Sequence, residues 1–411
     1  MFIGHFTEEP WQKEDWPLEW GSGVMQVSNS EYDPRLAAHL YNRYLDEKVY
    51  AEEVGFDGIM LNEHHSAPFC LNSVANVQAA ILARITTKAK ILLLGNILPI
   101  HDDPLWLAEQ LAMIDVISKG RLIPGVVRGG GSESIAHNTP PHFNRERFEE
   151  AHDFLIKTWT TPGPFRWEGK HYQYRYVNPW AVPYQKPHPP MWVPGTASKE
   201  TVEWAAQHRY PYIMLATQIE LTQQMYKVYY DTAREEGYEA GPQHLGFMFF
   251  FHVEETEEKA MEYGRTLTMG VRSPFDPGVE RPRPWIMSPP GISSKSARAL
   301  QRQMLAVDST GHTHAGARAS FEDQVATNGM IVGTPDSVIP KIRYILETLR
   351  PGTILFRTGD GAMTHETQMR TLKLMGAEVL PRIREIAKEL DLPGPYEVDP
   401  TTNEAYAAVA S

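Results

Sequence analysis

Cysteine is nearly absent from this sequence, since Cys70 is the only one among 411 residues. A single thiol cannot form an internal disulfide, and it excludes a metal site built from several cysteines. A chain without disulfides suits a reducing compartment, and we therefore expect the protein to be cytoplasmic.

Long hydrophobic runs and clusters of basic residues are also missing. The longest apolar runs, such as ILLL and MFFF, are far shorter than the roughly 20 residues that span a bilayer. The N-terminus, MFIGHFTEEPWQKED, lacks the cationic and apolar regions of a signal peptide. The net charge is −12 and no run of five or six basic residues occurs. These features predict a globular protein that binds neither nucleic acid nor membranes.

What the sequence does contain is a regular alternation of short β-rich runs and longer helical patterns. Strands are expected at 2–6, 56–61, 90–95, 121–127, 191–193, 212–215, 245–253 and 352–356. Helices are expected at 35–54, 73–86, 103–117, 144–160, 198–208, 219–236, 335–349 and 366–389. Strand–helix alternation of this kind predicts a parallel α/β fold.

Eight such units suit a closed (β/α)₈ TIM barrel with insertions better than two open sheets. No Gly-x-Gly-x-x-Gly opens a helix after the first strand, which disfavours the doubly wound alternative. We expect one domain over residues 1–411. In a barrel of this kind the active site lies at the carboxyl ends of the strands.

The second expected strand, in FDGIMLNEHHS, runs directly into Glu63, His64 and His65. A solvated loop, a metal site and a proton-transfer site are the three interpretations. Adjacent histidines rarely bind one ion together, and no spaced His or Cys ligands accompany them, so we predict no metal. The strand-end position favours proton transfer by His64, with Glu63 or His65 setting its protonation state.

Two further strand ends suit a phosphate group. In GVVRGGG (125–131), Arg128 offers a planar fork, and glycines such as Gly129 let the backbone approach a ligand closely. Ser198 and Thr201 lie in the first turn of an expected helix, where free N–H groups favour an anion. Simple N-capping by Ser198 is the alternative. Together with a histidine at a third strand end, these features favour a phosphorylated cofactor.

Three long segments occur in the order found in one known family. They are AEEVGFDGIMLNEHHS, DPLWLAEQLAMIDVISKGRLIPGVVRG and PYQKPHPPMWVPGTASKETVEWAAQ. They resemble the bacterial luciferase-like flavin-dependent monooxygenases, closely over 1–215 and loosely over 325–390. Motifs of this length are far more specific than a short pattern.

The resemblance implies a role for each matching position. Arg128, Ser198 and Thr201 would hold the phosphate of FMN, and His64 would lie near the reactive edge of the flavin. Gly95-Asn96 would mark a bulge of the third strand beneath the flavin ring, with Asn96 contributing to cofactor binding.

Two positions depart from the pattern of the light-emitting subunit. Val127 stands where that subunit has a cysteine, and Ala197 replaces an acid beside the phosphate. Both departures argue against bioluminescence.

The activity implied is that of a monooxygenase that uses reduced FMN (FMNH2) and O2. A separate flavin reductase would supply the reduced FMN, and a homodimer is expected. The alternatives are a deazaflavin-dependent hydride-transfer enzyme on the same barrel, a metal-dependent barrel hydrolase and a non-catalytic flavin-binding protein. Trp11, Trp16, Trp20 and Phe69 suggest a small apolar or aromatic substrate.

The segment 264–328 is too long for a plain β/α connection. It contains six prolines between Pro274 and Pro290, with bulky apolar residues such as Trp285 among them. Disordered linkers are poor in such residues. We expect a mobile lid over the active site, or alternatively a dimer arm.

Overall fold

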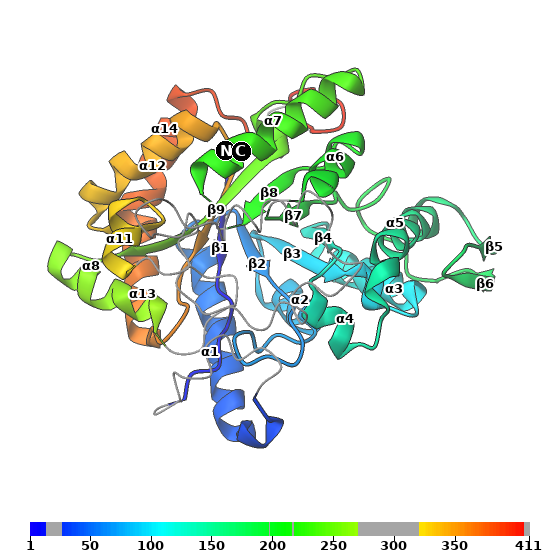
Figure 1. Ribbon diagram of the computed structural model, residues 1–411, viewed down its shortest axis with the longest axis horizontal. Coiled ribbons are helices and arrows are strands. Elements are labelled where there is room, and N and C mark those ends of the chain that lie inside the picture. The colour runs from blue at the N-terminus through cyan, green and yellow to red at the C-terminus, as the bar shows by residue number, and fades with distance from the viewer. Residues whose placement is uncertain (14–26, 197, 216–217, 270–319, 407–411) are drawn as a thin grey trace, which may run out of the picture.

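The computed structural model describes residues 1–13, 27–196, 198–215, 218–269 and 320–406. Its centre is a nearly closed barrel of eight parallel strands with helices around it (Figure 1). In sequence order the barrel strands are β1 (Phe2–Phe6), β2 (Gly58–Leu61), β3 (Lys90–Ile97), β4 (Leu122–Val127), β7 (Val193–Gly195), β8 (Tyr212–Leu215), β9 (Leu245–Val253) and β11 (Thr353–Arg357). This confirms the predicted (β/α)₈ barrel and its eight strands.

The ring is closed between β4 and β7 by the residue just before β7. Around the barrel the strands follow the order β4-β3-β2-β1-β11-β9-β8-β7. The Trp192 amide donates to the Pro124 carbonyl at 3.0 Å, and the Val126 amide donates to the Trp192 carbonyl at 3.1 Å. The β4–β7 junction therefore depends on one short backbone bridge.

The expected helices are present around the barrel. They are α1 (Pro34–Glu53), α2 (Ala75–Ile85), α3 (Pro104–Ser118), α5 (Asn144–Thr160), α6 (Lys199–Gln207), α7 (Ile219–Glu235), α12 (Pro335–Leu349), α13 (His365–Leu374) and α14 (Leu380–Glu389). The prediction of one continuous last helix is wrong, because a π-helical segment, Met375–Val379, separates α13 from α14. Pro381 lies in the first turn of α14, and it lacks the N–H that a regular α-helix would use there.

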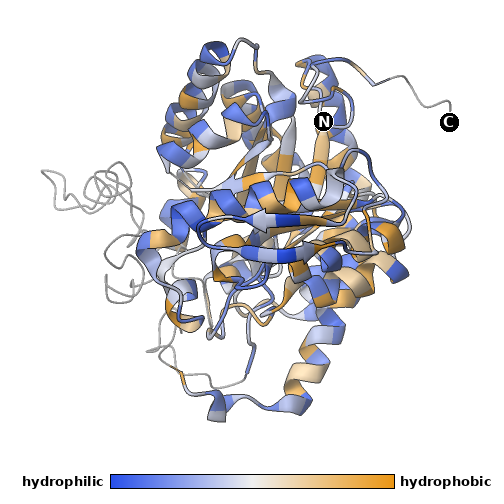
Figure 2. Ribbon diagram, turned by 90° about the vertical axis from the view of Figure 1, so that its right-hand side faces the viewer, coloured by the Kyte–Doolittle hydropathy of each residue, from blue (hydrophilic) through white to orange (hydrophobic). Residues whose placement is uncertain are grey.

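Apolar side chains fill two layers. Inside the barrel, residues such as Phe6, Met60 and Met248 form one buried cluster, and Trp192 belongs to it. Alternate strand residues point outward and pack against the helices in a larger cluster. The helices alternate between hydrophilic and hydrophobic residues along their length (Figure 2), as expected when one helix face covers a sheet. None of the described helices is both long and apolar enough to cross a membrane.

Several short elements were not predicted. They are the antiparallel hairpin β5 (Phe165–Glu168) and β6 (Gln173–Val177), the strand β10 (Met330–Gly333), the helices α4 (Gly131–Ala136), α8 (Glu257–Gly264) and α11 (Phe321–Ala326), and the 3₁₀ turns η2 (Asn29–Glu31), η3 (Leu98–Ile100), η4 (Pro141–Phe143), η5 (Pro242–His244) and η6 (Arg265–Thr268). Strand β10 pairs in parallel with the second half of β9. Elements this short give too few residues for a hydrophobic period to be recognised.

The long insertion predicted at 264–328 is described only at its two ends. Arg265 forms an ion pair with Glu322, and its guanidinium lies 5.1 Å from the centre of the Phe321 ring. The two ends of the insertion therefore meet. Residues 270–319, which carry the predicted lid, lie outside the described residues.

Candidate functional site

Polar side chains gather at the carboxyl ends of neighbouring barrel strands. The register between β3 and β4 shifts between Leu94 and Asn96, which confirms the predicted bulge. Gly95 is required there, because a Cβ atom at this position would lie 2.5 Å from Val127 Cγ1. The bulge places Asn96 at the fully buried end of β3.

His64 follows β2, and its ring is held by a residue that the sequence did not reveal. Its Nδ1 lies 2.9 Å from Glu133 Oε1, and the His65 amide donates to Glu133 Oε2 at 3.1 Å. The Phe69 ring packs against the imidazole with centroids 4.6 Å apart. Glu133 belongs to α4, which follows the glycine loop after β4. The signal available in the sequence was an acidic residue in the segment that follows β4, at the same end of the barrel.

The surroundings of His64 favour its charged form. Burial by itself lowers the pKa of this imidazole. The hydrogen bond to Glu133, together with the negative charges of Glu133, Glu8 and Glu63, outweighs burial and raises the pKa above its ordinary value. The imidazolium form is therefore more populated near neutral pH than in an exposed histidine.

Glu63 and His65 support the same loop without bonding to the His64 ring. Glu63 Oε2 accepts a hydrogen bond from the Ala75 amide at 3.0 Å, and its Oε1 lies 3.4 Å from His65 Nε2. Helix α2 begins at Ala75 and has no side-chain cap of its own, so Glu63 satisfies one of its free donors. The expected partner of the His64 ring was Glu63 or His65, whereas the hydrogen bond comes from Glu133.

A buried polar network extends the site to the ends of β1 and β11. Asn62 Nδ2 donates to Glu8 Oε2 at 2.7 Å, and the Arg357 guanidinium lies 3.4 Å from Glu8 Oε1. The Glu8 amide donates to Asp360 at 2.7 Å. Burial raises the pKa of the Glu8 carboxyl, and the charge of Arg357 opposes this shift. Sequence reasoning missed Glu8 and Arg357, although Glu8 lies just after β1 and Arg357 is the last residue of β11.

Arg128 lies at the end of β4 near a second arginine. It makes no hydrogen bond or ion pair within the described part of the chain. Burial, with the neighbouring charge of Arg145, lowers the pKa of its guanidinium to about 10, and Glu200 opposes the shift. Arg145 in turn donates to Thr201 Oγ1 at 3.4 Å. Sequence reasoning did not single out Arg145.

Ser198 and Thr201 lie at the start of α6, and Thr201 is the one that contacts Arg145. Thr201 Oγ1 donates to Ser198 Oγ at 3.1 Å, and Ser198 Oγ lies 3.3 Å from Glu200 Oε2. Ser198 occupies the N-cap position, but its side chain does not cap the helix. The N-capping alternative for Ser198 is therefore wrong. Ala197 lies outside the described residues.

The loop after β4 and the bulge of β3 lie against each other. Gly129 has a φ of +76°, and a Cβ at Gly129 would lie 2.5 Å from Ile97 Cγ2. Glycine is therefore needed for both the backbone conformation and the close approach. Asn96 Nδ2 donates to Asn76 at 3.0 Å, while its buried Oδ1 has no hydrogen-bond partner in the part of the chain that the structure describes.

These residues fit an anionic ligand at one end of the site. Arg128, which has no hydrogen-bond or ion-pair partner among the described residues, suits a phosphate group together with the neighbouring Arg145 and a helix start without a side-chain cap. The orphaned oxygen of Asn96 suits a hydrogen-bond donor. Among the described residues, no group of three or more His, Cys, Asp or Glu side chains is placed to hold a metal ion.

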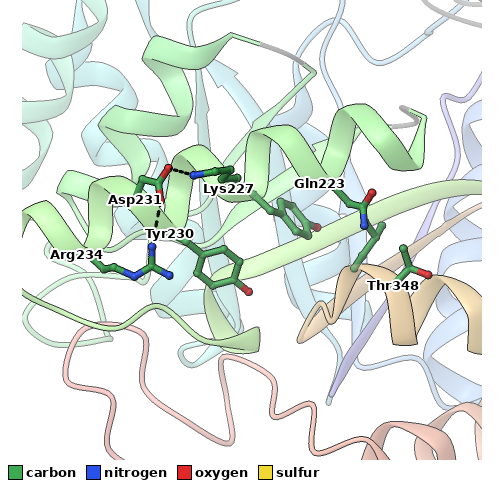
Figure 3. A pocket seen from close by; sticks show the side chains of 8 residues that line it. Gln223, Lys227, Tyr230, Asp231, Arg234 and Thr348 are labelled. Atoms are coloured by element: carbon green, nitrogen blue, oxygen red, sulfur yellow. Dashed lines mark hydrogen bonds and ion pairs between the residues drawn. The ribbon is translucent and has the colours of Figure 1, made fainter.

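Two other features lie apart from these strand ends. A surface pocket of about 360 Å³ lies between α7 and the C-terminal end of α12, and its Asp231 is bonded to both Lys227 and Arg234 (Figure 3). Because these charges are already paired, we assign the pocket no role. Trp11 is buried and stacks on Tyr32 at 5.3 Å, so it belongs to the core. Trp16 and Trp20 lie outside the described residues.

Curated relatives match part of the chain. The alkanal monooxygenase alpha chain of Photorhabdus luminescens is 30% identical over 164 residues, which cover 40% of this chain and 45% of the relative. The oxygenase component of the flavin-dependent trigonelline monooxygenase of Acinetobacter baylyi is 27% identical over 179 residues, 43% of this chain and 49% of the relative. The matches thus span about half the length of these two relatives.

Solved structures match almost the whole fold. A monooxygenase from Streptomyces bottropensis superposes with a TM-score of 0.69 at 23% identity, covering 93% of this chain and 100% of that chain. The oxygenating constituent of 3,6-diketocamphane monooxygenase from Pseudomonas putida, solved with FMN, also gives 0.69, at 18% identity and with 93% and 98% covered. An F420-dependent secondary alcohol dehydrogenase gives 0.59 at 14% identity, with 83% and 94% covered. These likenesses confirm the fold.

A family model matches more of the chain than the two curated relatives do. The model of the luciferase-like monooxygenase family matches residues 26–350, which is most of the chain and includes the ends of β2, β3 and β4 and the start of α6. The resemblance recognised in the sequence is thereby confirmed. The chain belongs to the luciferase-like monooxygenase family.

Proposed function

We propose that this chain is the oxygenase component of a two-component monooxygenase that uses reduced FMN and O2. The observation that carries the proposal is the joint presence of two features at one barrel end. One is the unpaired Arg128 beside Arg145 and the start of α6. The other is the His64–Glu133 pair. The first suits a phosphate, and the second suits proton transfer.

Each residue has a defined task in this proposal. Reduced flavin, when bound, supplies the two electrons that allow one oxygen atom of O2 to enter the substrate and the other to leave as water. Arg128, Ser198 and Thr201 bind the phosphate, and Asn96 binds a polar group of the ring system. His64 holds a proton at the reacting edge. Phe69, packed on His64, helps to exclude water.

An F420-dependent hydride transfer is the second candidate, because two structural neighbours are named for that cofactor. A direct test is to titrate the purified chain with FMN and with a deazaflavin, each followed by absorbance. The protein loaded with reduced FMN is then mixed with O2 and a panel of aldehydes, ketones and aromatic compounds. We expect FMN binding and an oxygenated product. Deazaflavin binding without FMN binding, or reduced FMN that yields only hydrogen peroxide with every compound, would overturn the proposal.

We also propose that a separate reductase supplies the reduced FMN. The relative from Acinetobacter is named as an oxygenase component, and no Gly-x-Gly-x-x-Gly fingerprint for a dinucleotide follows the first strand. The chain with FMN and NADH should therefore oxidise NADH only when a flavin reductase is added. Steady NADH oxidation by the chain alone would contradict this assignment.

A homodimer is the expected assembly, and an exposed apolar face supports it. Helices α2 and α3 pack against each other. Of their eight exposed residues, seven are large and apolar. These are Val77, Ile81, Ile85, Trp106, Met113, Val116 and Ile117. Exposed apolar residues gathered on two neighbouring helices are typical of a protein–protein contact, and we propose that a second copy covers these two helices.

Ile81→Glu should convert the dimer to a monomer. Ile81 is 40% exposed on α2, and a carboxylate there would be buried without a partner in the dimer, which is strongly unfavourable. The molar mass of the variant is measured by sedimentation or light scattering. Tyr344→Glu is the control, because Tyr344 is 49% exposed on α12 and outside the proposed face. An unchanged mass for Ile81→Glu would show that the dimer, if present, uses another face.

A further inference from the structure

Glu133 lies in the segment that follows Arg128, and it bonds to the loop that carries His64 and His65. Its carboxylate accepts from the His64 ring with one oxygen and from the His65 amide with the other. The side chain of Glu133 is 4% exposed, and that of His64 is 18% exposed. A buried acceptor therefore holds one edge of an imidazole whose other edge is partly open.

The geometry determines the proton arrangement of His64. Because the nearest atom to Nδ1 is a carboxylate oxygen at 2.9 Å, Nδ1 carries a hydrogen and donates it. The His65 amide, which donates to the second carboxylate oxygen, keeps Glu133 from turning away. No hydrogen bond of His64 Nε2 occurs among the described residues, so this nitrogen is left for a ligand.

We propose that Glu133 is a positioning residue that fixes His64 with Nδ1 protonated and keeps Nε2 supplied with a proton for the oxygenation reaction. The inference rests on the proposed function. Glu133 itself does not contact the reacting atoms in this arrangement. It acts through His64, as a carboxylate does when it orients and stabilises a catalytic imidazolium.

The chain segment that carries Glu133 also carries the phosphate arginine. Arg128 ends the β4 region, Gly129 turns with a φ of +76°, and α4 begins at Gly131. Six residues thus place both Arg128 and Glu133. A cofactor phosphate bound at Arg128 would fix the same loop that holds His64, so cofactor binding and the placement of the proton donor are linked.

The charge of Glu133 also predicts a direction of pH dependence. The charged groups that act on His64 are Glu133 on α4, Glu8 after β1 and Glu63 in its own loop, and Glu63 in turn lies 3.4 Å from His65 Nε2. The pKa of His64 is raised in the folded protein. Its contribution to stability is therefore full below the unfolded pKa of about 6.5 and is lost as the pH rises through the higher folded value.

The variants Glu133→Gln and Glu133→Ala test the inference. In cofactor-free protein, nuclear magnetic resonance of the imidazole nitrogens gives the tautomer and the pKa of His64. We expect Glu133→Gln to keep Nδ1 protonated, because an amide oxygen still accepts, but to lower the His64 pKa. Glu133→Ala should lose both the preference for a protonated Nδ1 and the raised pKa of His64. The matched control is Glu146→Gln, which alters a surface pair in which Glu146 Oε2 lies 2.9 Å from His171 Nε2 and should leave His64 unchanged.

Activity provides the second measurement. With reduced FMN and O2, the pH above which product yield falls should move to lower pH in Glu133→Gln, and Glu133→Ala should lose at least about tenfold in coupled product. FMN affinity should stay within about threefold in Glu133→Gln, because Arg128 is intact. An unchanged His64 pKa and tautomer in both variants would overturn the role of Glu133. A parent protein that binds no FMN would instead overturn the proposed function. In that case the nuclear magnetic resonance measurement would still show whether Glu133 fixes the tautomer and the pKa of His64.

Discussion

His64→Ala should cut coupled product formation about 10²–10⁴-fold while leaving FMN affinity nearly unchanged. The imidazole is the one polar ring at the end of β2 that combines a buried carboxylate partner with a partly open edge. Its removal deletes the proton donor without touching Arg128 or the start of α6. Rapid mixing of the reduced, FMN-loaded variant with O2 and substrate gives both product and peroxide yields, and peroxide should rise as product falls.

His171→Ala is the matched control for this experiment. His171 also pairs with a glutamate, Glu146, but it lies in the β5–β6 turn and not at the strand ends. It should retain the parent yield. A normal product yield in His64→Ala would remove His64 from the mechanism. Stoichiometric zinc in the purified protein would restore the hydrolase alternative.

Arg128→Ala should weaken FMN binding by about 1.5–3 kcal/mol, the range for a charge-assisted hydrogen bond. This corresponds to about 10–100-fold in Kd. The reason is that Arg128 is partly buried and, although the charge of Glu200 acts on it, it makes no ion pair with any described residue, so its guanidinium is available to a phosphate. Equilibrium titration with FMN and with riboflavin, which lacks the phosphate, separates the contribution of the phosphate to binding from that of the rest of the flavin. The loss should appear with FMN and be nearly absent with riboflavin.

Two further variants, Ser198→Ala and the control Arg166→Ala, are titrated with FMN in the same way. Ser198 should contribute less than Arg128, because the backbone donors of α6 remain after its side chain is shortened. Arg166 lies on the exposed hairpin strand β5 and pairs with Glu168, so its loss should leave FMN affinity unchanged. Parent-like FMN affinity in both Arg128→Ala and Ser198→Ala would show that the phosphate assignment is wrong.

The barrel was predictable because its strands and helices are long enough to show their periods. The strand LGFMFFFHV at 245–253 is buried throughout, as its continuous apolar run predicts. The hairpin β5–β6 was missed because all of its residues except Val177 are partly or fully exposed, so the two strands give no buried period. The interruption before α14 was missed because helical periodicity continues across a single π turn.

The sequence predicted which residues lie at individual strand ends, but it did not predict which side chains of the candidate site pair with one another. Sequence position places His64 and Arg128 at the carboxyl ends of β2 and β4. It does not reveal that Glu133, 69 residues from His64 in the chain, supplies the partner of the imidazole. Trp11 was predicted as a candidate substrate contact, but it belongs to a buried apolar cluster with Leu40 and Tyr44. Pairings of this kind depend on tertiary geometry that a single sequence does not contain.

The narrow β4–β7 junction has a consequence for the motions of the barrel. The other neighbouring strands share three or more paired residues, whereas this junction relies on the backbone of Trp192. We therefore expect the Val126 and Trp192 amides to exchange with deuterium sooner than those in the middle of β1 and β2, because local opening begins where protection is thinnest. Val126 lies two residues before Arg128, so opening at the β4–β7 junction would let the loop proposed to bind phosphate move without unfolding the barrel.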